Sequence, residues 1–171
     1  MFRNSVAALA LLSLAATAQA SDMPAPAAAP AASDFTLSAN LTLASQYRYR
    51  GLMQTNNKPA IQGGFDLAHA SGFYLGNWNS SISWLGDSNP DVSAPVEMDF
   101  YGGYKGNLAE GVPVDLGILQ YYYPGDFPSG YTSPDTTELY AGIGYGPLMF
   151  KYSIALTNLF GFADSKYSQY F

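Results

Sequence analysis

Residues 35–51 read FTLSANLTLASQYRYRG and alternate between apolar and polar side chains. Phe35, Leu37, Leu41 and Leu43 share one parity, whereas threonine, asparagine, glutamine and arginine side chains occupy the other. Successive side chains of a β-strand point to opposite faces, so this stretch predicts a strand with one apolar and one polar face. The alternation lasts about fifteen residues, whereas soluble strands usually run about five or six. This pattern favours a strand that separates lipid from water, as in a transmembrane barrel.

The segments that precede this strand predict export. Arg3, a short apolar run and the small residues of Ala18-Gln19-Ala20 form the pattern of a cleaved signal peptide over residues 1–20. Residues 21–33 are rich in alanine and proline and have no periodicity, which is typical of a linker. We therefore expect one exported domain over residues 34–171, with the bacterial outer membrane as its destination.

Composition narrows the class of protein further. Aromatic residues make up 15 % of the chain against 12 % charged residues, and tyrosine is the commonest aromatic with 14 copies. Tyrosine suits positions where a ring touches both lipid and water. The chain has no cysteine, so the domain folds without disulfides. Its 13 acidic and 7 basic residues give a net charge of −6, which argues against a nucleic-acid partner.

Seven further segments are predicted as strands: 59–70, 73–85, 96–105, 113–123, 136–145, 148–157 and 165–171. In the first seven strands every charge lies on the parity opposite the apolar set, as expected where a lipid-facing Arg or Lys costs roughly 2–4 kcal/mol. A soluble sheet with one wet face would show the same segregation. The charged residues predicted to line the interior are Arg48, Arg50, Asp66, Glu97, Asp99, Lys105, Asp115, Glu138 and Lys151.

Two other patterns favour a membrane barrel. The predicted connections alternate between short turns and longer loops, as between the periplasmic and outer rims of outer-membrane barrels. Aromatic residues collect near both predicted rims, as in the interfacial girdles of such barrels. The girdle candidates are Phe35, Tyr47, Tyr49, Tyr74, Trp84, Tyr104, Tyr122 and Tyr145, and strand 73–85 is predicted to turn Tyr74, Trp78 and Trp84 toward lipid.

The predicted fold is therefore all-β, an antiparallel up-and-down transmembrane β-barrel. About eight strands lie in this chain, as part of a larger barrel of about twelve. In a narrow barrel the interior charges would pair and fill the space, whereas a wider barrel would leave a pore.

Several blocks of the sequence resemble the TorF-type porin family. They include SQYRYRG at residues 45–51, NWNSSISW at 77–84, VEMDFYGGYKG at 96–106 and DTTELYAGIGYG at 135–146. The resemblance covers most of residues 34–171 and implies a bacterial outer-membrane barrel that conducts small solutes. Members of that family usually continue with further strands, so the barrel domain in this chain is expected to be incomplete.

The resulting functional prediction is passive diffusion of small hydrophilic solutes. Expected partners are outer-membrane lipid and lipopolysaccharide, the solutes, and the barrel-assembly machinery. The alternatives are a non-conducting membrane barrel with a structural, adhesive or loop-borne role, and a soluble periplasmic β-protein that binds a ligand. His69 is the single histidine and lacks a recognisable catalytic pattern, so we expect neither an enzyme nor a cofactor or metal site.

Overall fold

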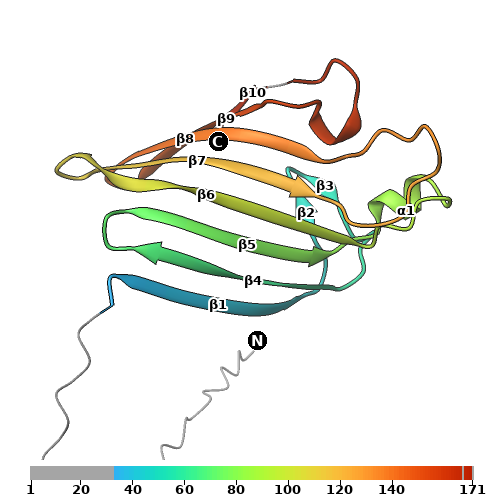
Figure 1. Cartoon of the computed structure of the whole chain (residues 1–171), viewed down its shortest axis with the longest axis horizontal. Helices are drawn as coiled ribbons and strands as arrows, with labels where there is room; N and C mark the ends of the chain where they lie inside the picture. Colours follow the sequence, from blue (N-terminus) through green and yellow to red (C-terminus); the bar gives the residue numbers. More distant parts are fainter. Residues whose placement is uncertain (1–32, 167, 171) are drawn as a thin grey trace, which may run out of the picture. The chain divides into compact units, whose positions relative to one another are not determined.

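Most strands of the chain lie in one antiparallel sheet (Figure 1). The computed structural model describes residues 33–166 and 168–170, so the predicted signal peptide and residues 21–32 of the predicted linker lie outside the described residues. The strands are β1 Phe35–Ala44, β2 Arg48–Tyr49, β3 Leu52–Met53, β4 Ala60–His69, β5 Phe73–Ser81, β6 Val96–Ala109, β7 Val112–Tyr122, β8 Thr136–Tyr145, β9 Leu148–Ala155 and β10 Ser168–Tyr170.

The main sheet has eight strands in the order β1-β4-β5-β6-β7-β8-β9-β10, and neighbouring strands run antiparallel. The predicted all-β, antiparallel up-and-down arrangement is therefore confirmed. Within the described residues β1 pairs with β4 alone and β10 pairs with β9 alone. The sheet is thus open, and the predicted closure into a barrel is not seen.

Short and long connections alternate along the sheet. The short turns are residues 70–72, 110–111 and 146–147, whereas the longer connections are 45–59, 82–95, 123–135 and 156–167. Because successive strands reverse direction, the short turns lie at one end of the sheet and the long connections at the other (Figure 1). We call these the short-turn end and the loop end.

The first predicted strand ends earlier than expected. β1 stops at Ala44, and β2 and β3 form a separate two-stranded hairpin. Its turn is Arg50-Gly51, with φ angles of 48° and 83°. Positive φ at both central residues is typical of the type I′ turns that close tight hairpins. Arg48 and Arg50 therefore belong to this hairpin, and their predicted place in a wall strand was wrong.

The two faces of the main sheet differ in chemistry and in exposure. On one side, which we call the apolar face, large side chains such as Leu37 (71 % exposed), Leu41 (77 %) and Ile118 (46 %) are open. On the other side, the polar face, Glu97 is 3 % exposed and Glu138 is 1 % exposed. Water-soluble domains bury apolar side chains and expose charged ones. The burial of these side chains is the inverse.

The prediction for β5 placed its side chains on the wrong faces. Its register sets Asn77 opposite Phe65 and Phe100, which puts Asn77 on the apolar face and Tyr74 and Trp78 on the polar face. A shift of one residue in the assumed phase reverses every side chain of a strand. The Asn77 amide is compensated where it lies, because its Nδ2 donates a hydrogen bond to the carbonyl oxygen of Asp99 at 3.2 Å.

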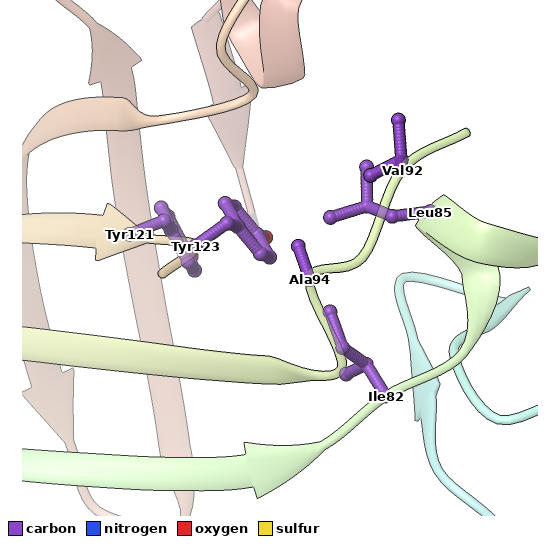
Figure 2. Close-up of a cluster of buried hydrophobic side chains, with 6 residues drawn as sticks. All are labelled: Ile82, Leu85, Val92, Ala94, Tyr121 and Tyr123. Atoms are coloured by element: carbon purple, nitrogen blue, oxygen red, sulfur yellow. The ribbon is translucent and has the colours of Figure 1, made fainter. Parts of the chain in front are cut away.

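The long connections fold into a buried cluster at the loop end. Figure 2 shows Ile82, Leu85, Val92, Ala94, Tyr121 and Tyr123 facing one another from β7, helix α1 Trp84–Ser88 and the segments beside them. Trp84 therefore lies in a helix, not in the strand predicted over residues 73–85. We call this cluster and the long connections around it the loop cap. In the part of the chain that the structure describes, no helix is long and apolar enough to cross a lipid bilayer.

Candidate functional site

The polar face brings together seven of the nine charged residues predicted to line the interior. The strand register places all seven on this one face of β4 and β6 to β9. They are Asp66, Glu97, Asp99, Lys105, Asp115, Glu138 and Lys151. The two remaining candidates, Arg48 and Arg50, come from the β2–β3 hairpin and differ in their surroundings.

Glu97 joins the wall of the sheet to the loop cap. Its Oε1 accepts a hydrogen bond from the Tyr47 hydroxyl at 2.7 Å, and its Oε2 accepts one from the Tyr123 hydroxyl at 2.7 Å. Burial, followed by the neighbouring Glu97 charge, raises the pKa of both tyrosines above the usual value of 10.0. Both phenols therefore stay protonated and remain donors at neutral pH.

Arg50 makes the second connection between the loop cap and the wall. Its Nη1 and Nη2 donate to the two carboxylate oxygens of Glu138, each at 3.2 Å. Paired, two-point contacts of this kind fix orientation as well as charge. The guanidinium also lies 4.5 Å from the centre of the Tyr49 ring, and the Tyr49 and Tyr121 hydroxyls are hydrogen-bonded at 2.6 Å. These contacts attach the hairpin to Tyr121 of β7 and Glu138 of β8.

The other two candidates near the loop end are placed differently. Arg48 is exposed and contacts Gln46 Oε1 at 3.3 Å and Asn57 Oδ1 at 3.2 Å, so it does not reach the polar face. Asp99 lies on that face two residues from Glu97 and is 9 % exposed. Its Oδ1 has no hydrogen-bond partner among the described residues. Nor do those residues contain a group of three or more His, Cys, Asp or Glu side chains that could hold a metal ion.

Toward the short-turn end, the polar face holds an open cleft of about 230 Å³, which we call the lysine cleft. Hydroxyls of its tyrosines donate to acidic side chains: Tyr74 donates to Asp115 Oδ1 in the cleft at 2.6 Å, and Tyr101 donates to Asp66 Oδ1 beside the cleft at 2.7 Å. The Tyr74 and Tyr140 hydroxyls are hydrogen-bonded to each other. The residues that line the cleft are Tyr74, Tyr101, Lys105, Asp115, Leu119, Tyr140 and Lys151.

Glycines let the tyrosine rings lie against the neighbouring strands. A Cβ atom added to Gly117 would come within 2.4 Å of the Tyr140 ring, and one added to Gly76 would come within 2.5 Å of the Tyr101 ring. Such contacts are too close for any real side chain, so each ring occupies the space that a glycine leaves free. The rings therefore cover the wall of the cleft instead of filling its volume.

Two lysines complete the cleft. Lys105 Nζ lies 4.5 Å from the centre of the Tyr74 ring, and Lys151 Nζ lies 4.0 Å from the centre of the Tyr140 ring. Across residues 33–166 and 168–170, neither lysine forms an ion pair. The sequence identified both lysines as interior candidates, but the parity pattern assigned Tyr74, which lies beneath Lys105, to lipid.

The aromatic girdle candidates separate into two groups. Exposed side chains on the apolar face near strand ends are Phe35, Tyr104, Tyr122 and Tyr145. Tyr47, Tyr49 and Trp84 pack into the loop cap, and Tyr74 lies in the lysine cleft. The hydroxyls of Tyr47, Tyr49 and Tyr74 form hydrogen bonds in the loop cap and the lysine cleft, which accounts for their positions there. Alternation of apolar and polar residues does not reveal such bonds.

His69 lies at the short-turn end and belongs neither to the loop cap nor to the lining of the lysine cleft. Its Nδ1 is 2.6 Å from the Ser71 hydroxyl, and its ring centre is 4.6 Å from that of Phe35. In the described residues no carboxylate is hydrogen-bonded to this pair, so it lacks the orienting acid of a catalytic triad.

One comparison with known proteins gives a match. The family model described as a bacterial protein of unknown function (Gcw_chp) matches residues 28–171, a range that contains the whole main sheet. No curated protein and no solved structure matches the chain.

Proposed function

We propose that this chain, which belongs to the bacterial family Gcw_chp, forms the wall of an outer-membrane β-barrel that passes small hydrophilic solutes. The inverted burial pattern carries the proposal: apolar side chains are exposed along the strands while Glu97, Asp99 and Glu138 are buried on the opposite face. A soluble sheet and a membrane barrel share the same alternation, but only the barrel turns its apolar parity outward. The same inversion argues against a soluble periplasmic ligand-binding protein.

The ends of the apolar face support the same proposal. Phe35, Tyr104 and Tyr145 lie toward the short-turn end, and Tyr122 lies at the loop end. Aromatic rings at both borders are expected where strands pass from hydrocarbon to headgroups. Moving a large apolar side chain from water into lipid stabilises the folded protein by about 1.5–3 kcal/mol.

A closed wall requires that both open edges of the sheet be paired. As the first and eighth strands of an alternating series, β1 and β10 run in opposite directions. Their directions suit antiparallel pairing with each other, with another copy of the chain, or with further strands. Every residue of β1 from Phe35 to Leu43 is exposed, as expected for a strand that lacks one neighbour.

The first experiment addresses membrane location. The full chain, including the predicted signal peptide, is expressed in a Gram-negative host, and the envelope is fractionated with and without detergent. We expect the protein in the outer-membrane fraction, extractable only by detergent, with different gel mobility before and after boiling. Recovery in the soluble periplasmic fraction would contradict the proposal.

The loop cap favours a second candidate function, a non-conducting outer-membrane barrel. Leu85, Tyr121 and Tyr123 are almost fully buried at the loop end, so the cap packs densely where a path would open. Purified protein in a planar bilayer distinguishes the two. Discrete conductance steps support a channel, whereas a correctly inserted but silent protein supports the second candidate.

A further inference from the structure

The acidic side chains in and beside the lysine cleft already have hydrogen-bond partners. Asp115 accepts from Tyr74 at 2.6 Å and Asp66 accepts from Tyr101 at 2.7 Å. These bonds hold each carboxylate against the wall and occupy part of its hydrogen-bonding capacity. The negative charges of the cleft are therefore partly satisfied by the protein itself.

The basic side chains of the cleft remain available. Lys105 is opposite Asp115 in the β6–β7 register, yet no ion pair joins them, and Lys105 Nζ lies 4.5 Å from the centre of the Tyr74 ring. Contact with a ring face leaves ammonium N–H groups free, because an ammonium carries three donors. Lys151 lies over Tyr140 in the same way, at 4.0 Å.

Space for a ligand lies beside these ammonium groups. Gly142 separates Asp115 of β7 from Lys151 of β9 in the same row of the sheet. A Cβ atom at Gly142 would meet nothing closer than 3.6 Å, so no side chain occupies the position between them and a methyl group would fit there in ordinary van der Waals contact. The cleft as a whole measures about 230 Å³, which limits it to small molecules.

We infer that the lysine cleft binds a small anionic solute through a carboxylate or phosphate group held by the ammonium groups of Lys105 and Lys151. Oxygen atoms of such a group accept charge-assisted hydrogen bonds, which are stronger than bonds between neutral partners. Leu119 and the tyrosine rings cover the wall beside the remainder of the solute. The inference deepens the proposed function by naming the charge of the solute.

The binding test uses the full chain in detergent micelles and isothermal titration with inorganic phosphate, succinate and, as a neutral probe, glycerol. We compare Lys105→Gln/Lys151→Gln with Lys58→Gln/Lys166→Gln, which removes the same charge from exposed positions outside the cleft. The cleft variant should bind the anions at least about tenfold more weakly, because two charge-assisted hydrogen bonds are lost and the loss of even one exceeds the roughly 1.4 kcal/mol of a tenfold change. The control variant should stay within about twofold of the unsubstituted chain.

The outcomes separate the possible sources of the anion. Binding of phosphate alone assigns the cleft to phosphate groups, and binding of succinate alone assigns it to carboxylates; both support the inference. It is overturned if neither anion binds the unsubstituted chain, if glycerol binds as tightly as the anions, or if both double variants bind alike.

A third variant keeps both lysines and tests the role of the tyrosine hydroxyls. Tyr74→Phe leaves Asp115 without its donor, so the freed carboxylate should weaken anion binding by roughly two- to fivefold. Tyr145→Phe, on the exposed apolar face, is the matched control and should have no effect. Unchanged affinity in Tyr74→Phe would refute the argument that this hydroxyl keeps Asp115 from competing for the lysines.

Failure of the inference can be told apart from failure of the proposed function. The titrations are independent of conductance because they are carried out in micelles. A silent barrel that binds anions would refute the channel and keep the cleft. A conducting barrel that binds neither anion would support the channel and refute anion binding in the cleft.

Discussion

Ile118→Arg tests the proposal that the apolar face meets lipid. Ile118 lies within β7, opposite Gly102 and Leu139 on the apolar face, and is 46 % exposed. If this position lies near the middle of a bilayer, arginine there should destabilise the folded protein by roughly 2–4 kcal/mol. If the face meets water instead, the exposed charge should change the stability by less than about 0.5 kcal/mol.

Leu108→Arg is the matched control for depth. Leu108 is more exposed, at 74 %, but lies at the short-turn end of β6. Near a bilayer interface the cost of arginine falls to about 0–1 kcal/mol. The chain is refolded into lipid vesicles, and the free energy of unfolding is measured by urea titration with fluorescence of its two tryptophans. Equal costs for both variants, within about 0.5 kcal/mol, would refute a lipid-facing apolar face.

Two further predictions concern the loop cap. Arg50→Ala removes the cation from Glu138, which is 1 % exposed, and should destabilise the protein by about 3–5 kcal/mol in urea titrations and loosen the cap. Arg48→Ala, at an exposed site, should change the stability by less than about 0.5 kcal/mol, and equal effects of the two changes would show that the Arg50–Glu138 ion pair does not stabilise the protein. The raised pKa of Tyr47 and Tyr123 predicts stability that is fully present below the unfolded pKa of about 10 and is lost as the pH rises toward the folded pKa. Tyr47→Phe/Tyr123→Phe should flatten this loss in urea titrations across that range, and an unchanged slope would show that these phenols do not cause it.

The repetitive part of the fold could be predicted from sequence because it depends on a local period. The strands predicted at residues 59–70, 136–145 and 148–157 lie within two residues of β4, β8 and β9. Alternation also places the charges of those strands on one face without knowledge of their partners. The short turns are similarly local, because each needs only a few residues with turn-forming preferences.

The places where prediction failed depend on contacts between distant segments. Residues 45–51 continue the alternation of β1, yet the chain leaves the sheet so that Tyr47 reaches Glu97 and Arg50 reaches Glu138. These partners are 50 and 88 residues away, and no local pattern contains them. Gly51 was the available local signal, because a glycine after a polar residue between short apolar runs is typical of a hairpin turn.

Tyrosine was the most ambiguous residue for face assignment, since its ring suits lipid while its hydroxyl suits a polar interior. In β5 the apolar residues Phe73 and Leu75 have the opposite parity to Tyr74 and Trp78, so composition alone permits either phase. The structure selects the phase that lets Tyr74 donate to Asp115, two strands away on β7. The face of this aromatic residue is therefore the one on which a carboxylate of the polar face accepts its hydrogen bond, and a search for apolar periodicity does not detect such a bond.

The loop cap and the lysine cleft divide the polar face into two parts that should respond differently to substitution. At the loop end Glu97 and Glu138 are bound to the cap by Tyr47, Tyr123 and Arg50, so under the proposed channel function changes there should alter whether a path opens. At the short-turn end the lysines are not ion-paired within the described residues, so under the proposed anion binding changes there should alter which solute binds. If the channel conducts only when the cap loosens, Arg50→Ala should therefore increase the conductance and leave the anion affinity unchanged. An increase in conductance accompanied by loss of anion affinity would instead show that both ends form a single structural unit.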